Sequence, residues 1–146
     1  MYTVLNCFYC SKYDQQWTCP PRIPKLDYKK TIKEYDNILI LEISLKVNEV
    51  NYSDMRYRST NEIHSALLKL EKLLWDNNFP LATSFIGGSC KLCKNGCAKD
   101  KCRNKSNSRI PIEATGINVV KTLQNIGIQI DFTDNTKINR YGMLLW

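Results

Sequence analysis

The spacing of apolar and polar positions in the first part of the chain predicts a strand with a helix before it. From Leu41 to Val47, apolar residues alternate with polar ones, so we expect a strand over 38–47 that buries one face. Over 25–35, tyrosine and isoleucine recur on one helical face, which predicts a short helix. Residues 7–25 have no such period and predict an irregular segment.

The next segment has the period of a long helix. Apolar residues recur three and four positions apart in one stripe, made up of Ile63, Ala66, Leu67, Leu70 and Leu74. Ser59 and Glu62 match a capping box, so the helix is expected to begin at Ser59 and to end at Pro80. His64, the one histidine of the chain, lies at the edge of the stripe. A structural role is favoured for it, and ligation beside three cysteines is the alternative.

Three further elements follow Pro80. Residues 81–86 read as a strand, and a helix is expected from Pro111 to a glycine cap at Gly127. Residues 128–132 alternate as another strand, and 141–146 are expected to pair back onto it across a turn.

This order of elements favours the α+β class. We expect a small, mostly antiparallel sheet with helices on one face and cysteine-rich loops, and a ferredoxin-like arrangement is one candidate. With 146 residues and 43% hydrophobic composition, the chain is expected to form a single cysteine-rich domain over 1–146. No stretch is apolar enough to predict a membrane span.

The strongest chemical signal is a C-x2-C-x3-C-x4-C run formed by Cys90, Cys93, Cys97 and Cys102. Spacings this short let one loop direct four thiolates at a common centre, either a zinc ion or a [4Fe–4S] cluster. An iron–sulfur cluster is favoured because structural zinc sites more often use two separated C-x2-C pairs, and zinc is the alternative. Glu113, early in the next helix, is expected to complement the helix dipole; a role beside the centre is the alternative.

Three more cysteines, Cys7, Cys10 and Cys19, form a sparser set. Three thiolates leave one coordination position open for a remote ligand, water or a substrate. All seven cysteines are thus candidate metal ligands, in one centre or two. Their odd number and the lack of a secretory signal pattern predict reduced thiols and a cytoplasmic location.

The N-terminal segment has too few regular apolar positions to pack alone. Because a metal site supplies folding free energy directly, we expect the first cysteine set to lie beside the second, either sharing its centre or building a neighbouring one.

Positive charge is concentrated in the second cysteine segment. Of the net charge of +7, the residues from Cys90 to Arg109 carry +6. The basic residues are Lys91, Lys94, Lys99, Lys101, Arg103, Lys105 and Arg109. Such a rim suits an acidic redox partner protein. Nucleic acid is less favoured as a partner, since no aromatic residues are interleaved with the basic ones.

Several motifs together resemble a known family. The matching residues are Cys7, Cys10, Trp17 and Cys19-Pro20-Pro21, then Cys90, Leu92, Cys93, Cys97 and Cys102-Arg103, then Arg109, Glu113-Ala114, Gly116-Ile117 and Val119. This pattern resembles the prokaryotic predicted metal-binding proteins known as domain of unknown function 2284. Three residues, 94–96, separate the second and third cysteines of the run where the family tends to have two, and Ile110-Pro111 replaces a proline-serine pair. The resemblance implies metal or iron–sulfur binding and implies no reaction.

Three functions remain open on the sequence. The favoured one is a small iron–sulfur protein in electron transfer or redox support. A zinc-stabilised module that binds a protein or nucleic acid is the second. The third is a metalloenzyme that uses the open three-cysteine site, for which the sequence offers no clear general acid or base.

Overall fold

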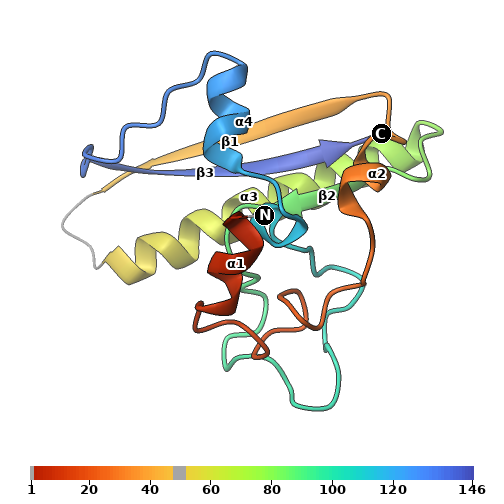
Figure 1. Cartoon of the computed structure of the whole chain (residues 1–146), viewed down its shortest axis with the longest axis horizontal. Helices are drawn as coiled ribbons and strands as arrows, with labels where there is room; N and C mark the ends of the chain where they lie inside the picture. The colour runs from red at the N-terminus through yellow and green to blue at the C-terminus, as the bar shows by residue number, and fades with distance from the viewer. Residues whose placement is uncertain (1, 48–51) are drawn as a thin grey trace.

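The computed structural model describes residues 2–47 and 52–146, whose course Figure 1 shows. Within these ranges, one antiparallel sheet has the order β1-β3-β2, with β1 (Ile38–Lys46), β2 (Thr83–Ile86) and β3 (Lys137–Leu145). The helices are α1 (Tyr2–Phe8), α2 (Tyr28–Ile32), α3 (Tyr52–Asp76), the 3-10 helix η1 (Ile112–Thr115) and α4 (Val119–Asn125). The α+β class with a small antiparallel sheet is confirmed.

The central strand is β3. Both β1 and β2 run antiparallel to it, so they are parallel to each other and form with α3 a β-α-β unit that β3 splits. At the middle of the sheet, Leu41 and Ile86 both lie opposite Gly142. A central strand is covered on both faces, which explains why all of 141–145 is buried. The ferredoxin-like arrangement is not confirmed.

One face of the sheet packs against α3. Ile63 and Leu67 of the helix form a buried cluster with Ile86 and Leu144 of the strands. Gly142 allows this close approach, because a β-carbon there would lie 2.6 Å from Leu67 Cδ1 and 3.2 Å from Ile63 Cδ1. The helix position is therefore set by the absence of a side chain at this one point of β3.

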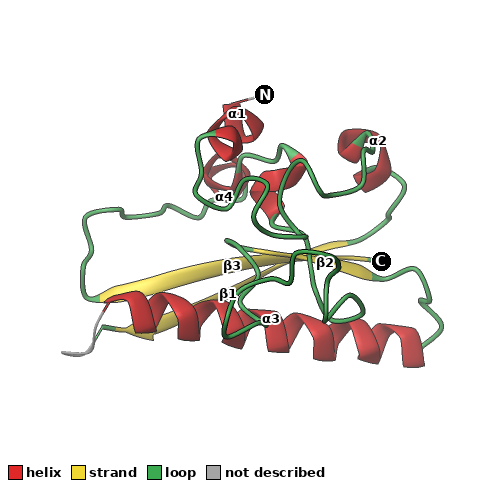
Figure 2. Cartoon of the chain, turned by 90° about the horizontal axis from the view of Figure 1, so that it is seen from below, coloured by secondary structure: helices red, strands yellow, loops and turns green. Residues whose placement is uncertain are grey.

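The opposite face carries a second core. Phe85, Met143 and Leu145 cluster there with Ile112 of η1. Figure 2 shows α3 on one side of the sheet and α1, α2 and α4 on the other. Helices thus lie on both faces of the sheet, whereas the sequence predicts helices on one face. No helix among the described residues is long and apolar enough to cross a membrane.

The capping-box prediction is wrong. The helix α3 begins at Tyr52, and Ser59 lies within it, fully buried. The Ser59 hydroxyl accepts a hydrogen bond from Arg140 Nε of β3 at 3.1 Å, and Glu62 pairs instead with Arg58 at 3.1 Å. A polar residue that resembles a cap is used here as a tie between the helix and the central strand.

The chain after the cysteine loop differs from its prediction in two places. The helix expected from Pro111 is divided by Gly116, whose φ of 91° separates η1 from α4. Gly127 ends α4 as predicted, with its N–H donating to the Gln124 carbonyl at 3.0 Å. Residues 128–132 form no strand.

The last strand is longer than its pattern predicts, and it has different partners. Since 128–132 is irregular, β3 pairs with β1 and β2 instead of closing a hairpin. Asp131 and Asp134 accept backbone N–H bonds from Thr133 and Thr136, at 2.8 and 2.9 Å. Such local bonds offer the backbone an alternative to a strand ladder.

Two smaller differences concern the N-terminal part. The helix α2 is shorter than 25–35, and the sequence does not predict α1, which has too few residues to establish a period. The strand prediction over 38–47 is confirmed by β1, in which Leu41, Ile43 and Leu45 are less exposed than the residues between them.

A buried ion pair joins α3 to the end of the cysteine loop. Glu71 is fully buried, and both of its carboxylate oxygens accept bonds from Arg109, with Nε to Oε1 at 2.7 Å. Arg109 also donates to the carbonyls of Ser106 and Ser108, at 2.9 and 2.8 Å. The guanidinium thus holds the loop backbone and the helix together.

His64 adds a second tie between the same segments. Its Nε2 lies 2.8 Å from the Asn107 carbonyl and donates to it, while Nδ1 has no hydrogen-bond partner among the described residues. This buried imidazole agrees with the structural role predicted for it.

We expect Glu71→Ala to lower the free energy of unfolding by about 3–5 kcal/mol, because it leaves the Arg109 charge buried without a partner. Chemical denaturation measures this. Glu62→Ala, on the same helix, removes the exposed partner of Arg58 and should cost about 1 kcal/mol or less. Equal losses in the two variants would contradict the role given to the buried pair.

Burial lowers the pKa of His64, and Arg109 lowers it further, while the Asn107 carbonyl and Glu71 oppose these effects. The unfolded chain therefore binds a proton more readily than the folded one. The free energy of unfolding should decrease as pH falls below about 6.5, the pKa of an unperturbed histidine. Denaturation at several pH values should show a weaker decrease for His64→Gln, which can still donate to Asn107. An identical pH dependence would count against this assignment.

Candidate metal centre

The cysteine loop starts at a fixed point on the sheet. A β-carbon at Gly87 would collide with the Tyr141 carbonyl of β3, so only glycine allows the backbone to lie this close. Gly88 has a φ of 80° and donates its N–H to Glu113 Oε2 at 3.5 Å. The loop therefore leaves the end of β2 in a direction that two glycines set.

Four cysteines of this loop surround one small cavity. The cavity has a volume of about 20 Å³ and is lined by Cys90, Cys93, Cys97 and Cys102 together with Trp17, Asn104 and neighbouring residues. Gly96, with a φ of 78°, donates its N–H to the Cys93 carbonyl at 3.0 Å. This turn uses the additional residue of the x3 spacing and brings Cys97 back towards the cavity.

The sulfur atoms of this set influence one another. Burial raises the pKa of the Cys90 thiol, and the charges of Cys97, Cys102 and Cys93 raise it further. A hydrogen bond from the Leu92 backbone acts in the opposite direction and lowers this pKa. The side-chain amide of Asn104 donates to Cys93 Sγ at 3.2 Å. N–H donors to sulfur of this kind stabilise thiolate ligands and tune the centre they bind.

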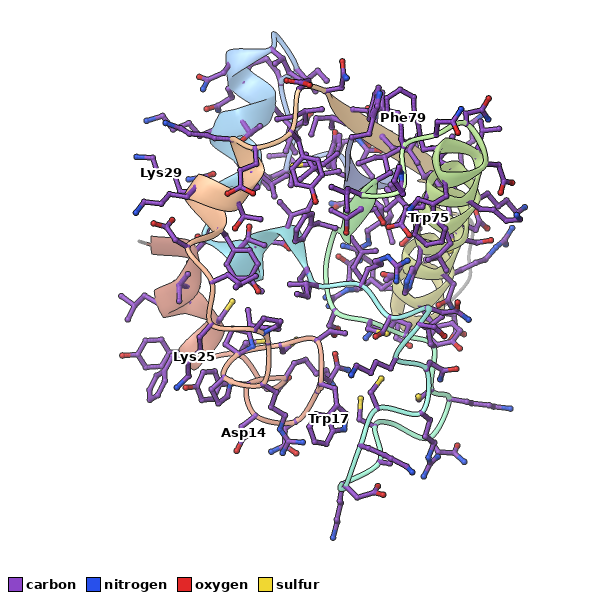
Figure 3. The ribbon with its side chains drawn as sticks, turned by 90° about the vertical axis from the view of Figure 1, so that its right-hand side faces the viewer. Asp14, Trp17, Lys25, Lys29, Trp75 and Phe79 are labelled. Carbon is purple, nitrogen blue, oxygen red and sulfur yellow. The ribbon has the colours of Figure 1, made fainter. Side chains whose placement is uncertain are left out.

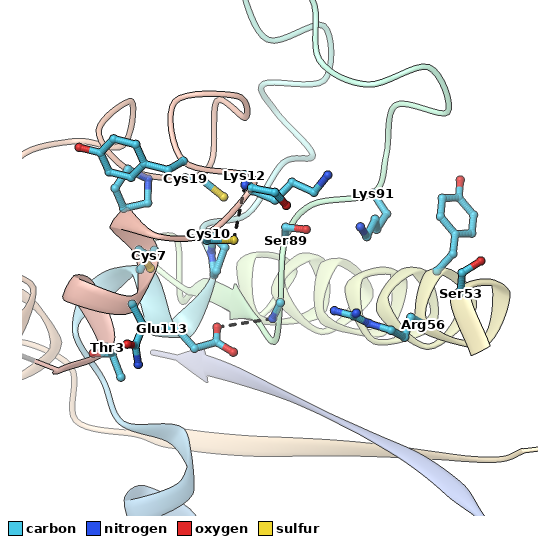
Figure 4. A pocket seen from close by; sticks show the side chains of 18 of the residues that line it. Thr3, Cys7, Cys10, Lys12, Cys19, Ser53, Arg56, Ser89, Lys91 and Glu113 are labelled. Atoms are coloured by element: carbon cyan, nitrogen blue, oxygen red, sulfur yellow. Dashed lines mark hydrogen bonds between the residues drawn. The ribbon is translucent and has the colours of Figure 1, made fainter. Parts of the chain in front are cut away.

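The N-terminal cysteines line a different and larger cavity. Cys7 lies in α1, and Cys10 and Cys19 lie in the turns that follow (Figure 4). Burial, then the charges of Cys10 and Cys7, raise the pKa of Cys19 to about 12. Lys12 donates its backbone N–H to Cys10 Sγ at 3.5 Å. The three thiols thus form a second group, near the first but with its own cavity.

Trp17 joins the two cysteine blocks. Its indole Nε1 donates to the Ala98 carbonyl of the loop at 2.8 Å, and its ring lines the small cavity. Figure 3 shows Trp17 between the N-terminal segment and the cysteine loop. The Arg22 guanidinium stacks 4.7 Å from the ring centroid and pairs with Asp14. The expectation that the two blocks lie side by side is confirmed.

The cysteines are metal-binding in type, but the structure does not arrange their side chains around a metal. All seven cysteines are free thiols. Within 2–47 and 52–146, no three Cys, His, Asp or Glu side chains are placed so that they could hold a metal ion together. The small cavity has room for about one atom of the size of a water molecule. Four thiols around such a space suit a soft metal, whereas a four-iron cluster would require the exposed loop to open.

The larger cavity combines thiols with positive charge. Its volume is about 680 Å³, and Lys12, Arg56 and Lys91 line it together with the three thiols. Burial lowers the pKa of Lys91, and repulsion from Lys12, Arg56 and Arg140 lowers it further. Burial and the charge of Cys10 raise the pKa of Cys7, and the charge of Glu113, which also lines this cavity, raises it further.

Sequence reasoning missed Arg56. It lies near the beginning of a helix, far in sequence from either cysteine block, and no local motif marks it. Only the packing of α3 beside the N-terminal turns reveals it.

The comparison with protein families gives a clear result. The model of a family described as predicted metal-binding protein (DUF2284) matches residues 3–146. The chain belongs to this family. The match covers both cysteine blocks and confirms the resemblance seen in the motifs; the family description indicates metal binding and specifies neither the metal nor its ligands. No curated protein and no solved structure matches this family member.

We expect Trp17→Phe to lower metal content, because the ring remains but the bond that fixes the N-terminal segment to the loop is lost. Trp75→Phe is the matched control, since Trp75 Nε1 makes the same kind of bond to the Ala82 carbonyl at 2.9 Å, away from the cysteines. Each substitution should cost about 0.5–1.5 kcal/mol in stability. Elemental analysis should separate the two variants, and an equal metal content in both would contradict the role of Trp17.

Proposed function

We propose that this DUF2284 protein holds a [4Fe–4S] cluster on Cys90, Cys93, Cys97 and Cys102 and serves in electron transfer or redox support. The observation that carries the proposal is that one short loop places all four thiols around one cavity, and the loop would open to admit the cluster. A cluster of this type supplies one-electron transfer, with a potential that depends on burial and on hydrogen bonds to sulfur. The Asn104 amide on Cys93 is one such bond.

The charge around the loop supports docking of an acidic partner protein. Five basic side chains of the loop are exposed, namely Lys94, Lys99, Lys101, Arg103 and Lys105. A mainly positive surface accelerates encounter with an acidic surface. Two other cations of the segment are used differently, since Lys91 lines the larger cavity and Arg109 pairs with Glu71.

A zinc-stabilised binding module is the second candidate. The small volume of the cavity favours it, because a single tetrahedral ion needs less movement of the loop than a cluster does. The same four cysteines would be the ligands, and the exposed basic side chains would contact a protein or nucleic acid.

Purification without oxygen and without a histidine tag should give a brown protein that contains iron and sulfide. Absorption spectra and elemental analysis measure this. A colourless protein with stoichiometric zinc would support the second candidate and contradict the first.

Serine substitution of any one of the four cysteines should lower the metal content of the loop centre, because each removes a thiolate from the set. Ser106→Ala, an exposed change in the same loop, is the control and should keep full metal content. If all four single variants keep full metal content, the proposed ligand set is wrong.

A further inference from the structure

The larger cavity has two chemically different sides. The thiols of the N-terminal set lie on one side and Arg56 and Lys91 lie on the other, while Ser89 and Lys12, whose backbone N–H donates to Cys10 Sγ, lie between them (Figure 4). The three cations come from separate parts of the chain: Lys12 from the N-terminal turns, Arg56 from α3 and Lys91 from the cysteine loop. Their convergence is therefore a product of the fold and not of a local charge run.

None of these cations is neutralised by an ion pair within the part of the chain that the structure describes. Arg56 stacks over the Tyr52 ring, with the guanidinium 5.9 Å from the centroid. Two carboxylates also border the cavity, but Glu113 lies on the thiol side, where it accepts from Gly88, and Asp54 pairs with none of the three cations. The positive side of the cavity is thus prepared for an anion.

The remaining walls and the size indicate the class of ligand. Tyr13, Pro20, Tyr57, Pro111 and Ala114 supply apolar surface. The volume of about 680 Å³ lies within the range of about 300–1,000 Å³ that small-molecule sites have. An apolar enclosure with a few convergent charges suits an organic molecule that carries a charged head group.

We infer that this cavity binds a small organic anion, whose carboxylate or phosphate head is held by Lys12, Arg56 and Lys91 while its apolar body packs against the tyrosine and proline walls. The thiols of Cys7, Cys10 and Cys19 then face the far end of the bound molecule. This site goes beyond the proposed function and does not require a cluster in the loop.

Isothermal titration of the purified protein with phenylacetate, phenyl phosphate and benzyl alcohol tests the inference. At least one anion should bind about tenfold or more tightly than the neutral alcohol, since charge-assisted hydrogen bonds supply the difference. Tighter binding of phenyl phosphate assigns a phosphate ligand, and tighter binding of phenylacetate assigns a carboxylate. Equal binding of all three probes, or no binding of either anion, would overturn the inference.

Two variants locate the site. Arg56→Gln should weaken anion binding about tenfold, and so should Lys91→Gln, because each loses a charged donor to the head group. Arg58→Gln removes the same charge from the same helix, outside the cavity, and should leave the affinity within about twofold, since exposed charges at a distance are screened. If Arg58→Gln weakens binding as much as Arg56→Gln does, the anion binds by general charge attraction and the assigned site is wrong.

Metal analysis of the same samples separates this inference from the proposed function. If the protein has full metal content but binds neither anion, only the anion site is overturned. Anion binding with the predicted variant pattern, in a protein that lacks iron and zinc, supports the anion site and contradicts the metal proposal.

Discussion

The buried pair of Glu71 and Arg109 is the interaction on which the arrangement of the cysteine loop depends. A carboxylate with no exposed surface is stable only when it is fully paired, so α3 and the end of the loop have to assemble together. His64 strengthens the same junction through Asn107. At the other end, Gly87 brings the loop against β3. With both ends held by the core, the loop between them can remain irregular and still present its thiols to one cavity.

The N-terminal segment then determines how the two cavities are related. It has little core of its own, yet Trp17 contributes a wall to the small cavity and Cys19 contributes one to the larger. The hydrogen bond from Trp17 to Ala98 holds this shared wall against the loop. A metal centre in the small cavity and an anion in the larger one would be separated by this single segment. The proposed metal centre and the inferred anion site would then lie next to each other.

The basic residues of the loop lie in three different environments, which a count of charges does not distinguish. The exposed lysines remain available to a partner, Lys91 faces the larger cavity, and Arg109 is an internal anchor. Arg56 joins the positive side of that cavity from a helix with no cysteine near it in sequence. Side chains of one type therefore differ in exposure and pairing, according to what the tertiary structure places opposite them.

The sequence alone determined the features that depend on neighbours along the chain. Alternation after Leu41 predicted β1, the apolar stripe predicted most of α3, and the close spacing of the cysteines predicted that four of them face one place. Tertiary structure decided what depends on distant partners. It made β3 central and therefore covered both faces of the sheet, it turned Ser59 from an apparent cap into a tie to Arg140, and it separated the seven thiols into two cavities. The physical reason is that period and spacing are local, whereas burial and charge pairing are properties of whichever segments meet in space.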